Sequence, residues 1–186
     1  MVLIYGTASS GKSNIAEDMA VLHSKETGSS LVYIATMENK TDAARERIKR
    51  HRQLREGKGF LTIEEMHKLS VHDLSVSGKT VLIECISNLC ANIYYKEMGD
   101  KVAKDSDIER MTEFVIDGVK KLSKTADEIF IVSNDIFSDG TIHDPWTESY
   151  MMYLAHVNEE LVKICDSFYE VINGIAYLHK GQEEKA

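Results

Sequence analysis

The residues from Gly6 to Ser13 read Gly-Thr-Ala-Ser-Ser-Gly-Lys-Ser, which is the pattern G-x-x-x-x-G-K-S of a phosphate-binding loop. They follow a short apolar run at Val2–Tyr5 and open a segment with helical character, so the loop would join a buried strand to a helix. The glycines let successive backbone N–H groups point at one phosphate, and the helix adds its positive end. The alternative is a glycine-rich turn that binds nothing. We expect a nucleotide-binding loop.

Two side chains of this loop have the chemistry that a nucleoside triphosphate requires. Lys12 would reach the outer phosphates, and the hydroxyl of Ser13 would ligate Mg²⁺. The backbone cradle would come from the other residues of the loop, which are Gly6, Thr7, Ala8, Ser9, Ser10 and Gly11.

Composition bounds the class of protein. The chain has 186 residues, of which 43% are hydrophobic, enough for an ordinary core. Its net charge of −8 argues against nucleic acid or an anionic membrane as the main partner. No apolar stretch approaches the roughly 18 residues that span a bilayer, and the first strand is too short for a signal peptide. Cys85, Cys90 and Cys165 form no CxxC pair, which favours reduced thiols and a cytoplasmic location.

The chain offers no clear domain boundary. Pro145 is its only proline, and no linker rich in serine and glycine interrupts it. We therefore expect one nucleotide-binding and catalytic domain over residues 1–180 and a polar C-terminal tail at 181–186.

Apolar, β-branched runs alternate with helical segments along the chain. The runs are nearly continuous, which is typical of strands buried on both faces. This alternation predicts an α/β fold in three layers, with a mostly parallel sheet flanked by helices. The expected strands are Val2–Tyr5, Leu31–Ala35, Thr80–Ile86, Glu128–Val132 and Phe168–Ile172, with shorter candidates at Phe60–Ile63 and Ala176–His179. The expected helices are Lys12–Lys25, Lys40–Glu56, Ser87–Met98, Asp105–Lys124 and Thr147–Cys165.

In such a sheet, ligands bind beyond the carboxyl ends of the strands. The second expected strand ends at Ala35 and is followed by Thr36 and Met37. Glu84 follows the apolar run of the third, where a Walker B strand carries the acidic residue that orients Mg²⁺ or its waters. A carboxylate that only caps the next helix is the structural alternative. We favour a role in the nucleotide site.

Residues 45–55 form a basic run in an otherwise acidic chain. On a helix, four residues of this segment share one face: Ala44, Ile48, His51 and Arg55. His51 would therefore lie beside an apolar stripe, with arginines close by. A basic run is most often a solvated helix face. A triphosphate needs compensating cations, however, and this run is the only dense supply in the chain.

Together these motifs resemble a known family, the bifunctional adenosylcobinamide kinase / adenosylcobinamide-phosphate guanylyltransferases of cobalamin assembly. The likeness runs in a consistent order from the first strand to about Lys180. Its most specific parts are R-I-x-x-H-R-x-x-R at residues 47–55 and L-I-E-C-I at residues 82–86. The phosphate loop alone is shared with many NTPases.

The resemblance implies a RecA-like P-loop NTPase fold and two reactions. The first phosphorylates adenosylcobinamide from ATP or GTP, and the second transfers GMP from GTP to that phosphate through a GMP–histidine intermediate. The histidine of the motif is His51, so the nucleophile role falls there, with Mg²⁺ held through Ser13 and Glu84. The GTP contacts of the family map onto the loop from Gly6 to Ser13, onto Ala35, Thr36 and Met37, onto Arg52, Gln53, Leu54 and Arg55, and onto Glu64 and Glu84. The resemblance also implies a homo-oligomer, with a trimer as the expected form and the basic helix near a subunit boundary.

Two other functions remain open from the sequence. One is a different P-loop small-molecule kinase, in which the basic helix acts as a lid. The other is a non-catalytic, nucleotide-dependent regulatory protein without a small-molecule substrate.

Overall fold

The computed structural model describes residues 1–69, 76–138 and 140–181, and within them seven strands form one sheet in the order β3-β2-β4-β5-β1-β6-β7. The strands are β1 (Val2–Gly6), β2 (Leu31–Ala35), β3 (Leu61–Glu64), β4 (Thr80–Glu84), β5 (Glu128–Asn134), β6 (Ser167–Ile172) and β7 (Ile175–Lys180). The helices are α1 (Lys12–Thr27), α2 (Asp42–Arg55), α3 (Ile86–Met98), α4 (Asp105–Ser123) and α5 (Pro145–Ile164).

The pairing of the strands identifies the fold. β1 to β6 pair in parallel, and β7 joins β6 antiparallel through a hairpin. The strand that leads into the phosphate loop, β1, is separated from the strand that ends at Glu84, β4, by one strand, β5. This is the order of a RecA-like P-loop fold. The predicted α/β class with a mostly parallel sheet is confirmed.

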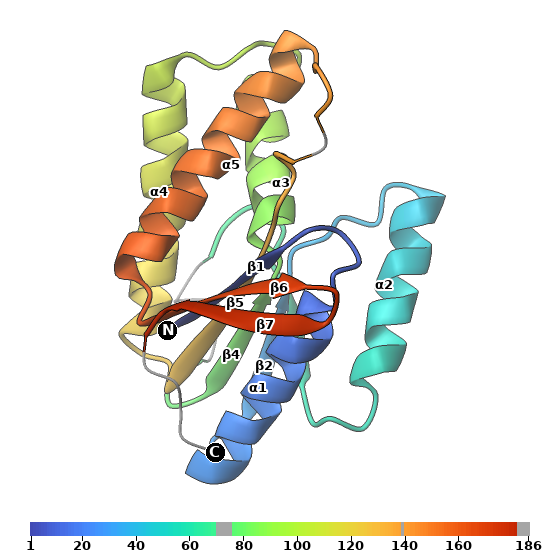
Figure 1. Ribbon diagram of the computed structural model, residues 1–186, viewed down its shortest axis with the longest axis vertical. Helices are drawn as coiled ribbons and strands as arrows, with labels where there is room; N and C mark the ends of the chain where they lie inside the picture. Colours follow the sequence, from blue (N-terminus) through green and yellow to red (C-terminus); the bar gives the residue numbers. More distant parts are fainter. Residues whose placement is uncertain (70–75, 139, 182–186) are drawn as a thin grey trace.

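Helices cover both faces of the sheet (Figure 1). Helix α1 lies on one face, and α3, α4 and α5 lie on the other. Two buried apolar clusters correspond to these two layers. One joins α1 to the sheet through residues such as Ile4, Ala16 and Leu82, and the other joins α3, α4 and α5 to the opposite face through residues such as Ile83, Leu89 and Val157. Helix α2 stands apart from both layers (Figure 1).

The expectation that the strands are buried on both faces holds for the centre of the sheet and is wrong for β6. All five residues of β4 are buried, whereas most of β6 is only partly buried. β6 lies next to the edge strand β7, so less of the molecule covers it. The third expected strand also ends earlier than Ile86, because the chain turns after Glu84 and Ile86 begins α3.

Capping residues fix the starts of two helices at positions that differ from the predicted ones. The side chain of Thr41 accepts a hydrogen bond from the N–H of Ala44, so α2 begins at Asp42 rather than at Lys40. The side chain of Asp144 accepts from the N–H groups of Trp146 and Thr147, and α5 begins at Pro145, two residues earlier than expected.

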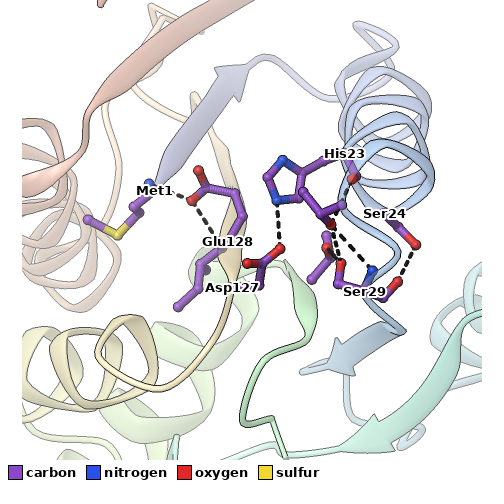
Figure 2. Close-up of polar contacts among 9 residues, drawn as sticks. Met1, His23, Ser24, Ser29, Asp127 and Glu128 are labelled. Carbon is purple, nitrogen blue, oxygen red and sulfur yellow. Dashed lines mark hydrogen bonds and ion pairs between the residues drawn. The ribbon is translucent and has the colours of Figure 1, made fainter.

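Polar contacts connect α1 and the sheet at the amino ends of the strands, which is the end opposite the phosphate loop (Figure 2). His23, near the end of α1, places Nε2 3.0 Å from Oδ2 of Asp127, just before β5. Ser24 donates to the carbonyl of Ser29, and the amino group of Met1 pairs with the carboxylate of Glu128. These contacts fix the end of α1 and the start of β5 to the sheet.

No helix in the described part of the chain is both long and apolar enough to cross a bilayer. The expected polar tail at 181–186 lies outside the described residues, apart from Gly181.

Candidate functional site

The phosphate loop takes a conformation that requires its glycines. A Cβ atom on Gly6 would meet the carbonyl oxygen of Val171 at 2.5 Å and Oγ of Ser10 at 2.8 Å, so no side chain fits there. Gly11 has φ of +93°, which favours glycine. A Cβ atom on Gly11 would lie 3.2 Å from Cα of Gly174. Gly11 therefore has the predicted bent backbone, whereas Gly6 is required because the chain packs closely against it.

The hairpin turn between β6 and β7 supports the loop from outside. The N–H of Gly174 donates to the carbonyl of Ser10 at 2.7 Å, and both turn residues, Asn173 and Gly174, have positive φ. Sequence reasoning did not assign this role. The sequence does signal the turn itself, since Asn-Gly between two strands is typical of a tight hairpin, but it does not signal the contact with the loop.

Lys12 lies within the loop that it is predicted to serve. Its side chain is buried, and Nζ donates to the carbonyl of Thr7 at 2.9 Å. Burial is the main cause that lowers the pKa of Lys12. The side chains of Thr7, Ala8 and Ser9 are exposed on the other side of the loop. The ammonium is thus held against the backbone of the loop.

Ser13, Glu84 and His51 meet at the mouth of this loop. Oγ of Ser13 donates to Oε1 of Glu84, and Nδ1 of His51 lies 3.5 Å from the same oxygen. The side chain of Glu84 is 8% exposed and that of His51 is 23% exposed. Three elements therefore converge here: the start of α1, the end of β4 and the inner face of α2.

The oxygen atoms in this cluster are of the kind that Mg²⁺ prefers. Oε2 of Glu84 is buried without a hydrogen-bond partner among the described residues, and the hydroxyl of Ser13 lies beside the same carboxylate. Within those residues no group of three or more His, Cys, Asp or Glu side chains comes together. A magnesium ion at a phosphate loop takes few protein ligands and draws the rest from phosphates and water. The residues present fit such an ion.

The predicted inner face of the basic helix is confirmed. Along α2, the only residues that are not exposed are Ala44, Ile48, His51 and Arg55. Arg55 is buried, and its Cζ stacks 3.4 Å from the centroid of the Tyr33 ring. This contact anchors the C-terminal end of α2 to the sheet.

A second anchor follows directly after α2. Nζ of Lys58 lies 2.7 Å from Oε2 of Glu17, a fully buried residue of α1. Burial raises the pKa of Glu17 against the opposing effect of this ammonium. Sequence reasoning missed this pair, because nothing in the local pattern around either residue indicates a contact between them.

A cleft of about 950 Å³ opens between α2 and β3, and we call it the larger cleft. Arg52 of α2 and Glu64 of β3 form an ion pair at 2.8 Å across it. Five of the predicted nucleotide contacts line this cleft: Met37, Arg52, Gln53, Arg55 and Glu64. The structure thus brings these five predicted contacts together at one cleft, whose lining includes no residue of the phosphate loop.

A cleft of about 420 Å³, the smaller cleft, opens on the other side of α2 toward α3. Its charged and amide side chains come from Arg47 of α2, Asn88 and Asn92 of α3, and Glu38 and Lys40 of the loop before α2. Met37 lines both clefts.

The other predicted contacts have different surroundings. Ala35 is half-buried at the end of β2, and its carbonyl accepts from the N–H of Glu65. The hydroxyl of Thr36 is buried and donates to the carbonyl of Cys85 at 2.8 Å, which ties β2 to the turn after β4. Leu54 is exposed and lines neither cleft.

A phosphate loop on a RecA-like sheet, with a buried lysine and a serine–carboxylate pair at its mouth, defines a P-loop nucleotide-binding protein. Residues 2–178 match the model of the cobinamide kinase / cobinamide phosphate guanyltransferase family, and the chain belongs to this family. The bifunctional adenosylcobalamin biosynthesis protein CobU of Escherichia coli (strain K12) is 25% identical to it over 181 residues, which cover 94% of this chain and 97% of that protein. The chain is therefore an enzyme of the nucleotide-dependent kinase and guanylyltransferase class.

Proposed function

We propose that the enzyme phosphorylates adenosylcobinamide and then transfers GMP from GTP to adenosylcobinamide phosphate in cobalamin biosynthesis. The product is adenosylcobinamide-GDP, and the transfer passes through GMP bound covalently to His51. Family membership supports the two reactions. The observation that carries the mechanism is the position of His51, 3.5 Å from Glu84 at the mouth of the phosphate loop.

The donor nucleotide spans the phosphate loop and the larger cleft. The loop backbone and Lys12 bind the phosphates, since all of these groups carry positive charge or N–H donors. The larger cleft takes the nucleoside. Glu64 lies at that cleft, and a carboxylate accepts hydrogen bonds from the N1–H and N2 amino groups of guanine.

The first half of GMP transfer depends on the orientation of His51. Nδ1 lies 3.5 Å from the carboxylate of Glu84, so a ring proton on Nδ1 would face that charge and leave Nε2 with the free lone pair. Nε2 forms a bond to the α-phosphorus as the bond from that phosphorus to the β-phosphate oxygen breaks, and pyrophosphate leaves. The positive charge that develops on the ring faces Glu84, which stabilises it.

The second half regenerates the histidine. A phosphate oxygen of adenosylcobinamide phosphate forms a bond to the same phosphorus as the N–P bond breaks. The imidazole leaves with the electron pair and is again neutral, with its proton still on Nδ1. No proton needs to move in either half, which suits a histidine whose Nδ1 is buried.

In the kinase reaction the hydroxyl oxygen of the corrinoid side arm forms a bond to the terminal phosphorus of ATP or GTP and gives up its proton to water. The bond from that phosphorus to the β-phosphate oxygen breaks, and the nucleoside diphosphate leaves. Lys12 and the loop hold the transferred group in line for this attack. Ser13 and Oε2 of Glu84 would hold Mg²⁺ in both reactions. When bound, that ion supplies Lewis-acid charge to the phosphates.

The test supplies the purified enzyme with adenosylcobinamide, ATP and GTP labelled at the α-phosphate. The wild type should form labelled adenosylcobinamide-GDP. His51→Ala should stop at adenosylcobinamide phosphate, whereas the matched variant His179→Ala, at an exposed histidine that pairs with Glu170 and lines neither cleft, should behave as wild type. Labelled product from His51→Ala would contradict the mechanism. Phosphorylation by the wild type without guanylyl transfer would favour the small-molecule kinase alternative. Nucleotide binding without turnover would favour the non-catalytic regulatory protein.

We also propose that residues 1–180 act as a single domain in a cytoplasmic homo-oligomer, with a trimer as the expected form. The likeness to the family supports this assembly, and sedimentation equilibrium tests it. A monomer at micromolar concentration would contradict it.

A further inference from the structure

Helix α2 separates two clefts, and His51 lies on its inner face between them. Lys49 and Arg52 line the larger cleft, whereas Arg47 lines the smaller one. Arg47 precedes His51 by one helical turn, so the two side chains lie on neighbouring parts of the helix surface. His51 itself lines neither cleft, but a group bound to Arg47 lies one helical turn from the proposed nucleophile.

We propose that the smaller cleft is the acceptor subsite, in which Arg47 binds the phosphate of adenosylcobinamide phosphate during GMP transfer. This inference rests on the function proposed above and adds the place from which the second substrate approaches. The phosphate oxygen in this cleft forms the new P–O bond as the N–P bond to His51 breaks.

Arg47 is available for an anion, unlike most of the other arginines of α2. Arg45 pairs with Asp42, Arg52 pairs with Glu64, and Arg55 stacks on Tyr33. No ion pair to Arg47 is found within residues 1–69, 76–138 and 140–181. An exposed guanidinium without a carboxylate partner is suited to bind a phosphate with two parallel hydrogen bonds.

Arg47 also lies near the reacting centre. Its positive charge adds to burial in lowering the pKa of Lys12, which places it within electrostatic range of the phosphate loop. Across the cleft, Asn88 lies in the first turn of α3, shortly after Glu84. The amide nitrogen of Asn92 already donates to the carbonyls of Thr36 and Met66, so Asn88 is the freer of the two amides.

The sizes of the clefts agree with this division. The larger cleft, at about 950 Å³, holds the residues predicted to contact the donor nucleotide. The smaller cleft, at about 420 Å³, is too small for a corrin ring, but its open side lets a phosphorylated side arm enter while the ring stays outside. Each substrate then reaches His51 from its own side of α2.

The experiment separates the two halves of the transfer. Enzyme is first charged with GTP labelled at the α-phosphate and freed of nucleotide, and adenosylcobinamide phosphate is then added over a range of concentrations. Arg47→Ala should take up label as wild type does, but require at least about tenfold more acceptor for half-maximal release of the label. Arg47→Lys should recover part of this loss. Arg50→Ala, at an exposed arginine that lines neither cleft, is the matched control.

Two results would overturn the proposal. One is release of label from Arg47→Ala with the acceptor dependence of wild type. The other is failure of Arg47→Ala to take up label, which would assign this arginine to the donor. Equilibrium binding tests the subsite without the histidine mechanism: wild type should bind adenosylcobinamide phosphate more tightly than adenosylcobinamide, and Arg47→Ala should lose that preference. If wild type takes no label but shows this preference, the histidine mechanism fails and the subsite stands.

Discussion

Nδ1 of His51 lies 3.5 Å from Oε1 of Glu84, and this contact joins helix α2, which stands apart from the two helical layers, to the fully buried strand β4. Ser13, the residue that closes the phosphate loop motif, donates to the same oxygen. A single carboxylate thus faces both the candidate nucleophile and the candidate magnesium ligand. In the proposed mechanism, the relative placement of the donor phosphates and the imidazole depends on this carboxylate.

Glu84→Gln should slow the formation of GMP-enzyme by about 100-fold. An amide has no charge to stabilise the cationic ring after attack, and it can present its NH₂ group to Nδ1 and so favour the wrong tautomer. The rate of label uptake from GTP labelled at the α-phosphate measures this effect. A rate equal to that of wild type would show that the carboxylate does not act on the imidazole.

Lys12→Ala should reduce nucleotide-dependent turnover by at least about 100-fold with little loss of stability. The ammonium makes one hydrogen bond to the loop carbonyl of Thr7 and has no ion pair among the described residues, so the fold gains little from it. Steady-state turnover and thermal unfolding are to be measured on the same preparation. Retained turnover in a folded variant would remove Lys12 from the mechanism.

Gly6→Ala should abolish tight GTP binding, because the new methyl group would meet the carbonyl oxygen of Val171 at 2.5 Å and force the loop away from β6. Gly78→Ala is the control, since its φ of +65° is also unfavourable to alanine but nothing lies within 4 Å of its Cβ. The control should lose about 1 kcal/mol of stability by urea unfolding and keep its GTP affinity. Equal GTP affinity in both variants would argue against the close packing of Gly6.

Asp127→Asn should lower stability at neutral pH and leave both reactions unchanged, because the residue lies at the edge of the sheet opposite the phosphate loop (Figure 2). A hydrogen bond from His23 is the main cause that holds the pKa of Asp127 below its ordinary value of 3.8. A carboxylate with a depressed pKa stabilises the fold above the unfolded value and loses this effect as the pH falls through the folded one. The difference in thermal unfolding between the two proteins should therefore begin to shrink at about pH 4 and vanish once the pH is below the lowered pKa of Asp127. A difference that persists unchanged in acid would mean that the charge of Asp127 is not its cause.

The sequence predicts the parts of this molecule that depend on local patterns. The phosphate loop, the central strands and the inner face of α2 follow from residue spacing and from continuous apolar runs. The start of α5 was also readable, since Asp144 before Pro145 is a helix-capping pattern that the periodicity argument did not use.

Contacts between distant segments could not be predicted in the same way. Nothing near Asn173 and Gly174 indicates that their turn supports the phosphate loop, because that contact arises only when β6 pairs with β1. Likewise, the sequence does not show that Arg55 is buried against Tyr33 while Arg47 stays open to a cleft. Helical spacing places Arg55 and not Arg47 on the inner face, but the partners of both side chains depend on the position of α2 against the sheet.

The most direct test of the mechanism is to locate the GMP adduct. The enzyme is incubated with GTP and Mg²⁺ without a corrinoid, digested at alkaline pH and sequenced by tandem mass spectrometry. We predict one adduct, on the imidazole of His51, that is stable in alkali and lost in acid. An adduct on another residue, or no adduct on an enzyme that still makes adenosylcobinamide-GDP, would contradict the account.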